Sequence, residues 1–417
     1  MKPRFLAQRL PSPESRRLVI VTGARQTGKT TLVRRTYPDL RYINLDAMEN
    51  RDMVKAVSTF AWHRDIGPAV LDEAQKEPGV FEKVKYAYDE GGISFSALLG
   101  SSQILLMSQV RESLAGRAFV FELWPLMFCE CLGSDIGETV RPPLLHDLLS
   151  TDDIGDVLDS IPAVLDGSEM VRRREVEQHL FHFGGMPELF RLKEADRIEW
   201  LKSYAYTYLE RDLADLARIA DLEPFKKFQR LAALRAGGLL NYSELSRDAA
   251  VSVDTSRRYL EYLRLSYQTI LLQPYMENLT SASVKTPKLY WVDMGLLRHL
   301  AGMMNASNGA LFENYVVGEL WKWIKTSGAN AELFFYRTRA GLEVDVLVRT
   351  PRGLIGIEIK AREQVTAGDF TPLRRVAAAA GSDWLGSLCV YRGTAIQPMG
   401  EGCWAVPAWR LFGSAVS

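Results

Sequence analysis

A glycine-rich stretch near the start of the chain has the composition and spacing of a phosphate-binding loop. Residues 23–30 read GARQTGKT and match the P-loop pattern G-x-x-x-x-G-K-[ST]. The two glycines allow a tight turn that brings backbone N–H groups close to phosphate oxygens. Lys29 would bridge the β- and γ-phosphates of a nucleoside triphosphate, and the Thr30 hydroxyl would coordinate Mg²⁺. The residues expected to bind the nucleotide in this loop are Gly23, Ala24, Arg25, Gln26, Thr27, Gly28, Lys29, Thr30 and Thr31.

The segments on either side of the loop fit the same chemistry. Four apolar residues at 18–21 precede it and are typical of a buried parallel strand. Residues 31–35 can continue as a helix, whose positive dipole end would point at the phosphates. The structural alternative is a strand–helix turn without a ligand, and the order of strand, loop and helix makes it the weaker interpretation.

Two acidic residues follow a later apolar run and could complete the site. Residues 41–46 predict a second short strand, and residues 68–71 predict a third that ends in Asp72 and Glu73. Downstream of a P-loop this is the Walker B arrangement, in which Asp72 would hold Mg²⁺ through water and Glu73 would polarise the attacking water. The alternative is an ordinary turn at a strand end.

Two other residues are candidates for contact with the γ-phosphate. Residues 96–100 predict a strand, and Ser101 at its polar end could act as a phosphate sensor, with simple turn chemistry as an equal alternative. Arg117 follows Gly116 and could act as an arginine finger on a neighbouring subunit of a homo-oligomer, or be an ordinary surface residue. The alternation of short strands with helices predicts a parallel sheet with right-handed crossovers.

Taken together, these motifs resemble those of the prokaryotic AAA-type ATPases that carry a nuclease-like C-terminal region of unassigned function. The resemblance covers nearly the whole chain and rests on residues 23–30, LDEAQ at 71–75, LGSS at 99–102, LAGR at 114–117, GGMPE at 184–188 and YLERD at 208–212. It implies ATP binding, with hydrolysis expected. Ser101 is a departure, because many AAA-type ATPases have asparagine at the sensor position.

Composition bounds the remaining possibilities. The 417 residues suffice for two or three domains, and 47% hydrophobic with 24% charged residues is ordinary for a soluble globular protein. A net charge of +0 excludes an overall positive field for nucleic acid, although a local basic face is still possible. We expect no signal peptide and no membrane span, and a cytoplasmic protein with four reduced cysteines. Residues 1–17 carry four arginines and are expected to be a solvated lead-in segment.

The middle of the chain predicts helices. Residues 134–180 are interpreted as irregular loops and solvated helix faces, and residues 200–235 have helical periodicity. A helix–turn–helix is expected over 243–265, with Ser243 and Asp254 as caps, followed by wing strands at 269–272 and 288–291.

This winged helix could bind DNA. Arg257 and Arg258 lie early in its second helix, where they could reach phosphates or bases. The alternative is a winged helix that packs between domains.

A second set of chemically active residues lies near the C-terminus. Residues 343–348 and 353–360 predict two strands, which carry Asp345 and the triplet Glu358-Ile359-Lys360. This looks like the metal-dependent nuclease core written PD-(D/E)XK, although Val344 stands where the pattern has proline. The resemblance implies that Asp345 and Glu358 hold Mg²⁺ and that Lys360 orients or activates water. A helix carboxylate would come from Glu319 or, with less support, Glu313; the alternative for Asp345 and Lys360 is a salt bridge.

The predicted fold class is therefore α/β with three parts. We expect an AAA-type P-loop domain with a parallel sheet over 1–190, a helical and winged-helix region over 191–305, and a smaller α/β restriction-endonuclease-like domain over 306–417. The predicted function is Mg²⁺-dependent ATP hydrolysis by a protein that acts on or near nucleic acid. The alternative is a nucleotide-gated DNA- or protein-binding switch without nuclease activity.

Overall fold

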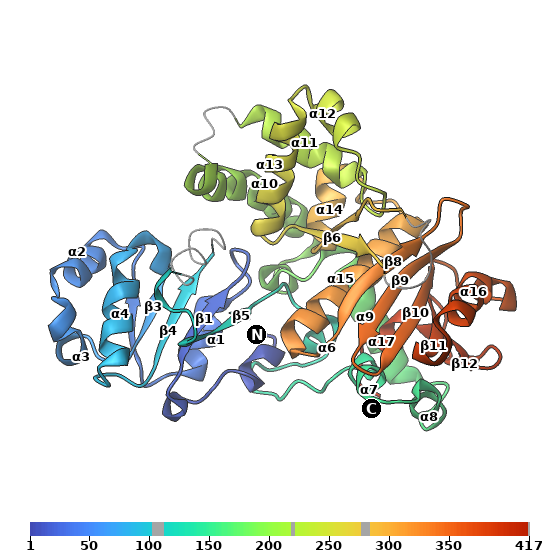
Figure 1. Ribbon diagram of the computed structural model, residues 1–417, viewed down its shortest axis with the longest axis horizontal. Coiled ribbons are helices and arrows are strands. Elements are labelled where there is room, and N and C mark those ends of the chain that lie inside the picture. Colours follow the sequence, from blue (N-terminus) through green and yellow to red (C-terminus); the bar gives the residue numbers. More distant parts are fainter. Residues whose placement is uncertain (102–111, 218–221, 277–283, 416–417) are drawn as a thin grey trace.

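The protein consists of two lobes, shown in Figure 1 as a computed structural model. Residues 1–101, 112–217, 222–276 and 284–415 are described, and of residues 207–217 only the backbone is described. The side chains of the YLERD motif therefore lie outside the described residues. The smaller lobe contains residues up to about 122, and the larger lobe contains most of the remainder. No helix in the described parts of the chain is long and apolar enough to cross a membrane.

The smaller lobe is built on a five-stranded parallel sheet of order β2-β3-β4-β1-β5. Its strands are β1 (Leu18–Thr22), β2 (Arg41–Asn44), β3 (Ala69–Asp72), β4 (Ser96–Gly100) and β5 (Ala118–Glu122). Its helices include α1 (Lys29–Thr36), α2 (Met48–Ala56), α3 (Trp62–Asp65) and α4 (Gly79–Asp89). Every residue of β1, β3 and β4 is buried, as expected for parallel strands covered on both faces. The predicted P-loop α/β sheet is therefore present.

The larger lobe is built on an eight-stranded mixed sheet of order β12-β13-β11-β10-β9-β8-β6-β7. Its strands are β6 (Thr269–Pro274), β7 (Lys288–Trp291), β8 (Glu332–Arg337), β9 (Glu343–Thr350), β10 (Gly353–Lys360), β11 (Trp384–Tyr391), β12 (Gln397–Pro398) and β13 (Cys403–Pro407). Residues 269–272 of β6 pair antiparallel with β7, and residues 273–274 pair in parallel with β8. The two expected wing strands are thus continuous with the C-terminal sheet.

Helices surround this second sheet and lead into it. They include α9 (Gly167–Phe183), α10 (Glu194–Ala217), α11 (Glu223–Leu234), α12 (Tyr242–Ala249), α13 (Val253–Leu265), α14 (Met294–Ala301), α15 (Gly309–Ser327), α16 (Thr371–Ala380) and α17 (Ala408–Leu411). The helices α12 and α13 form the expected helix–turn–helix, but its caps differ from the prediction. Asn241 caps α12 and Ser252 caps α13, because each helix begins earlier than the sequence pattern indicated.

The segment 134–180 is more ordered than we predicted, and it belongs to the other lobe. It contains α7 (Leu144–Ser150), α8 (Ile154–Asp159) and α9, which follow the short α6 (Phe128–Cys131). The backbone N–H of Leu144 donates to the carbonyl of Gly413 at 2.7 Å, and that of Ile396 donates to Ala163 at 2.9 Å. These helices therefore cover the C-terminal sheet (Figure 1), and the domain boundary placed at residue 190 falls inside the larger lobe.

The lead-in segment is only partly solvated. Phe5 is buried, and the centroid of its ring lies 4.7 Å from the ring centroid of Trp323 on α15. The Arg4 guanidinium is buried and donates to the carbonyl of Trp124, whereas Arg16 and Arg17 are exposed as expected. Residues 1–9 thus lie between the lobes, where Figure 1 places the N-terminus. The segment was predicted to be solvated because of its four arginines. Burial of apolar side chains such as Phe5 explains why it is not.

Candidate functional site

The P-loop has the backbone geometry that phosphate binding requires. Gly23 has φ of 148°, and a Cβ there would lie 2.2 Å from the carbonyl oxygen of Leu123, so a side chain does not fit. Gly28 has φ of 95° and precedes α1, whose N-terminal N–H groups open toward the loop. The Lys29 Nζ donates to the carbonyls of Gly23 and Ala24, both at 2.9 Å. The ammonium group is therefore held inside the loop.

The structure brings the predicted Mg²⁺ ligands together. The Thr30 hydroxyl donates to Asp72 Oδ2 at 2.6 Å. Thr30 lies on α1, which follows β1 and the P-loop, and Asp72 ends β3, which is separated from β1 by β4. The Tyr42 hydroxyl donates to the same oxygen at 2.8 Å and orients the carboxylate. Asp72 is buried at the carboxyl end of β3. A hydroxyl and a carboxylate oxygen are ligands that Mg²⁺ prefers, so this pair fits the ion.

Glu73 lies beside this pair in a strained conformation. Its φ of 54° is left-handed, which is uncommon for a residue with a side chain and is typical of functional sites. The carboxylate Oε2 accepts hydrogen bonds from Gln75 Nε2 at 2.5 Å and from the Ser101 hydroxyl at 3.4 Å. Ser101 thus contacts the predicted general base. Sequence reasoning assigned no role to Gln75 or Tyr42, although Gln75 lies in the LDEAQ motif.

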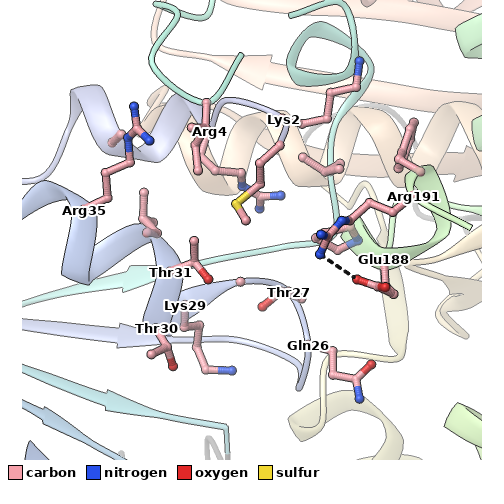
Figure 2. A pocket seen from close by; sticks show the side chains of 18 of the residues that line it. Lys2, Arg4, Gln26, Thr27, Lys29, Thr30, Thr31, Arg35, Glu188 and Arg191 are labelled. Atoms are coloured by element: carbon pink, nitrogen blue, oxygen red, sulfur yellow. Dashed lines mark hydrogen bonds and ion pairs between the residues drawn. The ribbon is translucent and has the colours of Figure 1, made fainter. Parts of the chain in front are cut away.

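A cavity of about 1350 Å³ lies over the P-loop, at the interface between the two lobes. Figure 2 shows Lys2, Arg4 and Arg191 on the opposite side of this cavity from Lys29 and Thr30. Arg191 forms an ion pair with Glu188 of the GGMPE motif at 3.5 Å. The cavity therefore has several cationic side chains that do not belong to the P-loop.

Two tyrosines of the larger lobe contact the P-loop or the residue just before it. Tyr204 on α10 lines the cavity, and its hydroxyl donates to the carbonyl of Arg25 at 3.3 Å. Tyr267, between α13 and β6, donates to the Thr22 hydroxyl at 3.0 Å, and both residues are buried. Thr22 is the last residue of β1 before Gly23. The helical periodicity of residues 200–235 does not predict the contact of Tyr204, and no sequence pattern marks Tyr267.

Arg117 lies at the other end of the sheet. Its carbonyl accepts from Leu18, the first residue of β1, whereas the P-loop follows the last residue of that strand. A five-residue strand places these ends roughly 13–16 Å apart. The guanidinium pairs with Asp89 at 2.6 Å. An arginine-finger role toward another subunit of a homo-oligomer stays a prediction, and the ion pair is the surface alternative.

The C-terminal acidic residues meet on neighbouring strands of the second sheet. Asp345 on β9 accepts a hydrogen bond from the backbone N–H of Ile359 on β10 at 2.8 Å. Glu358 Oε1 pairs with Lys360 Nζ at 2.6 Å, on the same face of β10. Lys360 thus contacts Glu358 directly, whereas the alternative interpretation paired it with Asp345. Burial, helped by Glu313 and Glu358, raises the pKa of Asp345 to about 8.

Glu319 lies outside this site, so our choice of it as the helix carboxylate was wrong. Glu319 is buried elsewhere: its Oε2 accepts the N–H of Phe128 at 2.9 Å and its other oxygen pairs with Lys322. Glu313, six residues earlier on α15, raises the pKa of Asp345 instead. Within the described residues no group of three or more acidic, histidine or cysteine side chains is close enough to hold a metal ion. The second oxygen of Glu358, Oε2, is nevertheless buried without a hydrogen-bond partner among them, which fits a role as a cation ligand.

Family comparisons divide the chain into three regions. Residues 15–132 match a family model described as an AAA domain. Residues 15–132 thus form an AAA-type P-loop domain. Residues 173–307 and 308–411 match two domains of unknown function, DUF8612 and DUF4143.

Similar proteins occur in bacteria and archaea. The chain is 28% identical over 358 residues to uncharacterised proteins of Mycobacterium bovis and Mycobacterium tuberculosis, covering 82% of this chain and 70% of each relative. An uncharacterised protein of Methanocaldococcus jannaschii is 22% identical over 357 residues, covering 80% and 72%. Among solved structures, a Walker-type ATPase of Pyrococcus abyssi matches with 16% identity and a TM-score of 0.43, covering 72% of this chain and 98% of that one.

Residues 15–132 form only part of the lining of the cavity over the P-loop. Lys2 and Arg4 precede it, and Arg191 and Tyr204 follow it in the chain. A nucleotide bound at the P-loop would therefore touch both lobes.

Proposed function

We propose that this chain binds ATP with Mg²⁺ and hydrolyses it. The contact that carries the proposal is the 2.6 Å hydrogen bond from Thr30 to Asp72, because it joins the P-loop to the Walker B strand next to Glu73. Thr30 and Asp72 would hold Mg²⁺, which would supply positive charge to offset that of the phosphates. Lys29 would bind the same phosphates. Glu73 would polarise the attacking water, with Ser101 and Gln75 holding its carboxylate.

A binding titration tests this proposal. Labelled ATP with Mg²⁺ is expected to bind wild-type protein saturably, and Lys29→Ala is expected to weaken binding at least about tenfold, because a charged contact to phosphate is lost. Lys76→Ala is the matched control, since Lys76 pairs with Asp46 and does not line the cavity. Absence of saturable binding to the wild type would overturn the proposal.

We further propose that the nucleotide state gates the larger lobe. The supporting contacts are those of Tyr204 with Arg25 and of Tyr267 with Thr22. A γ-phosphate that shifts the P-loop by a fraction of an ångström would change both contacts, and packed interfaces switch between discrete arrangements. Hydrogen exchange of α13 with and without ATP measures the coupling. Identical exchange in both states would exclude it.

For the C-terminal sheet we propose a PD-(D/E)XK-like site that acts on nucleic acid. Asp345 and Glu358 would hold a divalent cation, and Lys360 would orient water beside it. The exposed Arg257 and Arg258 on α13 would bind the DNA backbone. Metal-dependent cleavage by the wild type but not by Asp345→Ala or Lys360→Ala supports this activity.

The second candidate is a nucleotide-gated DNA- or protein-binding switch without nuclease activity. The observation that favours it is the direct ion pair of Lys360 with Glu358 Oε1, together with the lack of a three-acid cluster in the described chain. Saturable ATP binding with no cleavage in any divalent metal supports the switch.

A further inference from the structure

The carboxylate site of the second sheet receives two side chains from outside the 308–411 region. β7 precedes that region and carries Lys288 and Tyr290, which are two residues apart and so lie on one face of the strand. Lys288 Nζ pairs with Glu313 Oε1 at 3.1 Å and with Glu343 Oε1 at 2.7 Å. The Tyr290 hydroxyl donates to the same oxygen of Glu313 at 2.5 Å. The site is thus built jointly by β7, α15, β9 and β10.

The two halves of this site differ in how completely their acids are paired. Lys288 is only 4% exposed, and a buried ammonium is stable only when it is paired. In one half, Lys288 and Arg337 balance the carboxylates of Glu313 and Glu343, with Arg337 lying 3.2 Å from Glu343.

The other half has an acid oxygen without a partner. It contains the acids Asp345 and Glu358 and one ammonium group, Lys360, which pairs with Glu358 Oε1. Glu358 is 6% exposed, and its Oε2 is the oxygen that has no partner among the described residues. Because a buried polar oxygen without a partner is costly, this half is where an added cation would be stabilised.

We propose that Lys288 is a built-in cation that holds Glu313 and Glu343 and confines the site to one divalent cation, bound by Asp345 and Glu358. Lys288 is a positioning residue in this arrangement, because it acts through the acids it binds. The proposal rests on the metal-dependent function proposed for the C-terminal sheet. Lys288 already binds Glu313 and Glu343, which leaves Asp345 and Glu358 as the acids available to a cation.

Manganese binding to the full chain tests the stoichiometry. Calorimetry without nucleotide, in an Asp72→Asn background that removes the P-loop ligand, is expected to show one Mn²⁺ per chain. Asp345→Asn is expected to abolish this binding. Glu313→Gln keeps the shape of the side chain and is expected to retain one Mn²⁺ with weaker affinity, because it removes a nearby negative charge but no metal ligand.

The lysine itself is tested by substitutions that differ in charge. Lys288→Gln is expected to admit a second Mn²⁺ or to tighten binding on the order of tenfold, because a nearby positive charge is removed. Lys288→Arg keeps the charge and is expected to retain one Mn²⁺. If Lys288→Gln does not fold, as judged by circular dichroism, the Glu313→Gln result decides alone.

Three results separate the possible failures. Two Mn²⁺ in the wild type, or loss of binding in Glu313→Gln as complete as in Asp345→Asn, overturns the role of Lys288. No Mn²⁺ at the carboxylates overturns this inference and the metal-dependent function together. One Mn²⁺ with the expected variant pattern but no cleavage supports the inference and contradicts only the nuclease activity.

Discussion

Replacing Glu73 with glutamine isolates the hydrolytic step from nucleotide binding. The Glu73 carboxylate lines the cavity beside Thr30 and accepts hydrogen bonds from Gln75 and Ser101. A glutamine has the same size and can present its amide oxygen to the same donors. The substitution therefore removes the basic charge while the surrounding geometry is kept.

The expected magnitude follows from the role of the group. Loss of a positioned general base costs about 10²–10⁴-fold in rate, which corresponds to roughly 2.7–5.4 kcal/mol of activation free energy. Nucleotide binding depends on the P-loop amides, Lys29 and the pair Thr30 and Asp72, which the substitution leaves unchanged. We therefore expect the Kd for ATP to change by less than about threefold while kcat falls at least about a hundredfold.

Phosphate release at saturating ATP and a fluorescent-nucleotide titration measure these two quantities. Glu77→Gln is the matched control: it removes the same charge four residues along the chain, where Glu77 pairs with Lys55 at 3.3 Å. Its kcat is expected to stay within about twofold of the wild type, because Glu77 does not line the cavity. A Glu73→Gln protein that turns over ATP at the wild-type rate would refute the assignment of Glu73 as general base.

The other predictions concern coupling, pH dependence and the second site. Tyr267→Phe removes the hydroxyl that donates a hydrogen bond to Thr22, and we expect urea titration to show a loss of about 1 kcal/mol in the free energy of unfolding. In the same variant we expect ATP to cause no change in hydrogen exchange at α13. Burial raises the pKa of Glu177 from 4.5 to about 7, so the folded protein holds this proton more tightly than the unfolded chain, and stability falls as pH rises from about 4.5 to 7. Glu177→Gln is therefore expected to raise Tm relative to the wild type more at pH 8 than at pH 5 in scanning calorimetry, and an equal shift at both would contradict the buried acid. Asp345→Asn is expected to abolish metal-dependent cleavage while ATP turnover stays within about twofold, because the two sites use different strands; undiminished cleavage would exclude Asp345 as a ligand.

Features that depend on neighbouring residues could be predicted from the sequence. The strand, loop and helix around residues 23–30 lie in one stretch, and Asp72 and Glu73 follow their strand directly. Parallel strands end at one edge of a sheet, so their meeting at the P-loop follows from the fold class. The same reasoning placed Asp345, Glu358 and Lys360 together, since alternation along a strand is local information.

Features that depend on distant contacts could not be predicted in this way. Tyr267 and Thr22 are 245 positions apart, and no periodic pattern connects them. Glu313 and Glu319 lie on one helix, and at about 100° per residue six positions place them on different faces. The sequence does not show which face of this helix packs against β9. The choice between Glu313 and Glu319 therefore required the structure. By contrast, the apolar spacing of residues 144–149 was a helical signal that acidic composition obscured.

The two sites are joined by a short, continuous path through the larger lobe. Tyr267 bonds the residue that precedes the P-loop, and β6 begins two positions later at Thr269. β6 pairs with β7, in register from Thr269↔Trp291 to Leu272↔Lys288, so the same hairpin carries Lys288 into the carboxylate site. A hairpin bonded along its length moves as a unit, because displacing one strand alone would break buried backbone hydrogen bonds. A nucleotide that displaces Tyr267 would therefore also displace Lys288, which gives the proposed gating a specific route from phosphate to metal ligands.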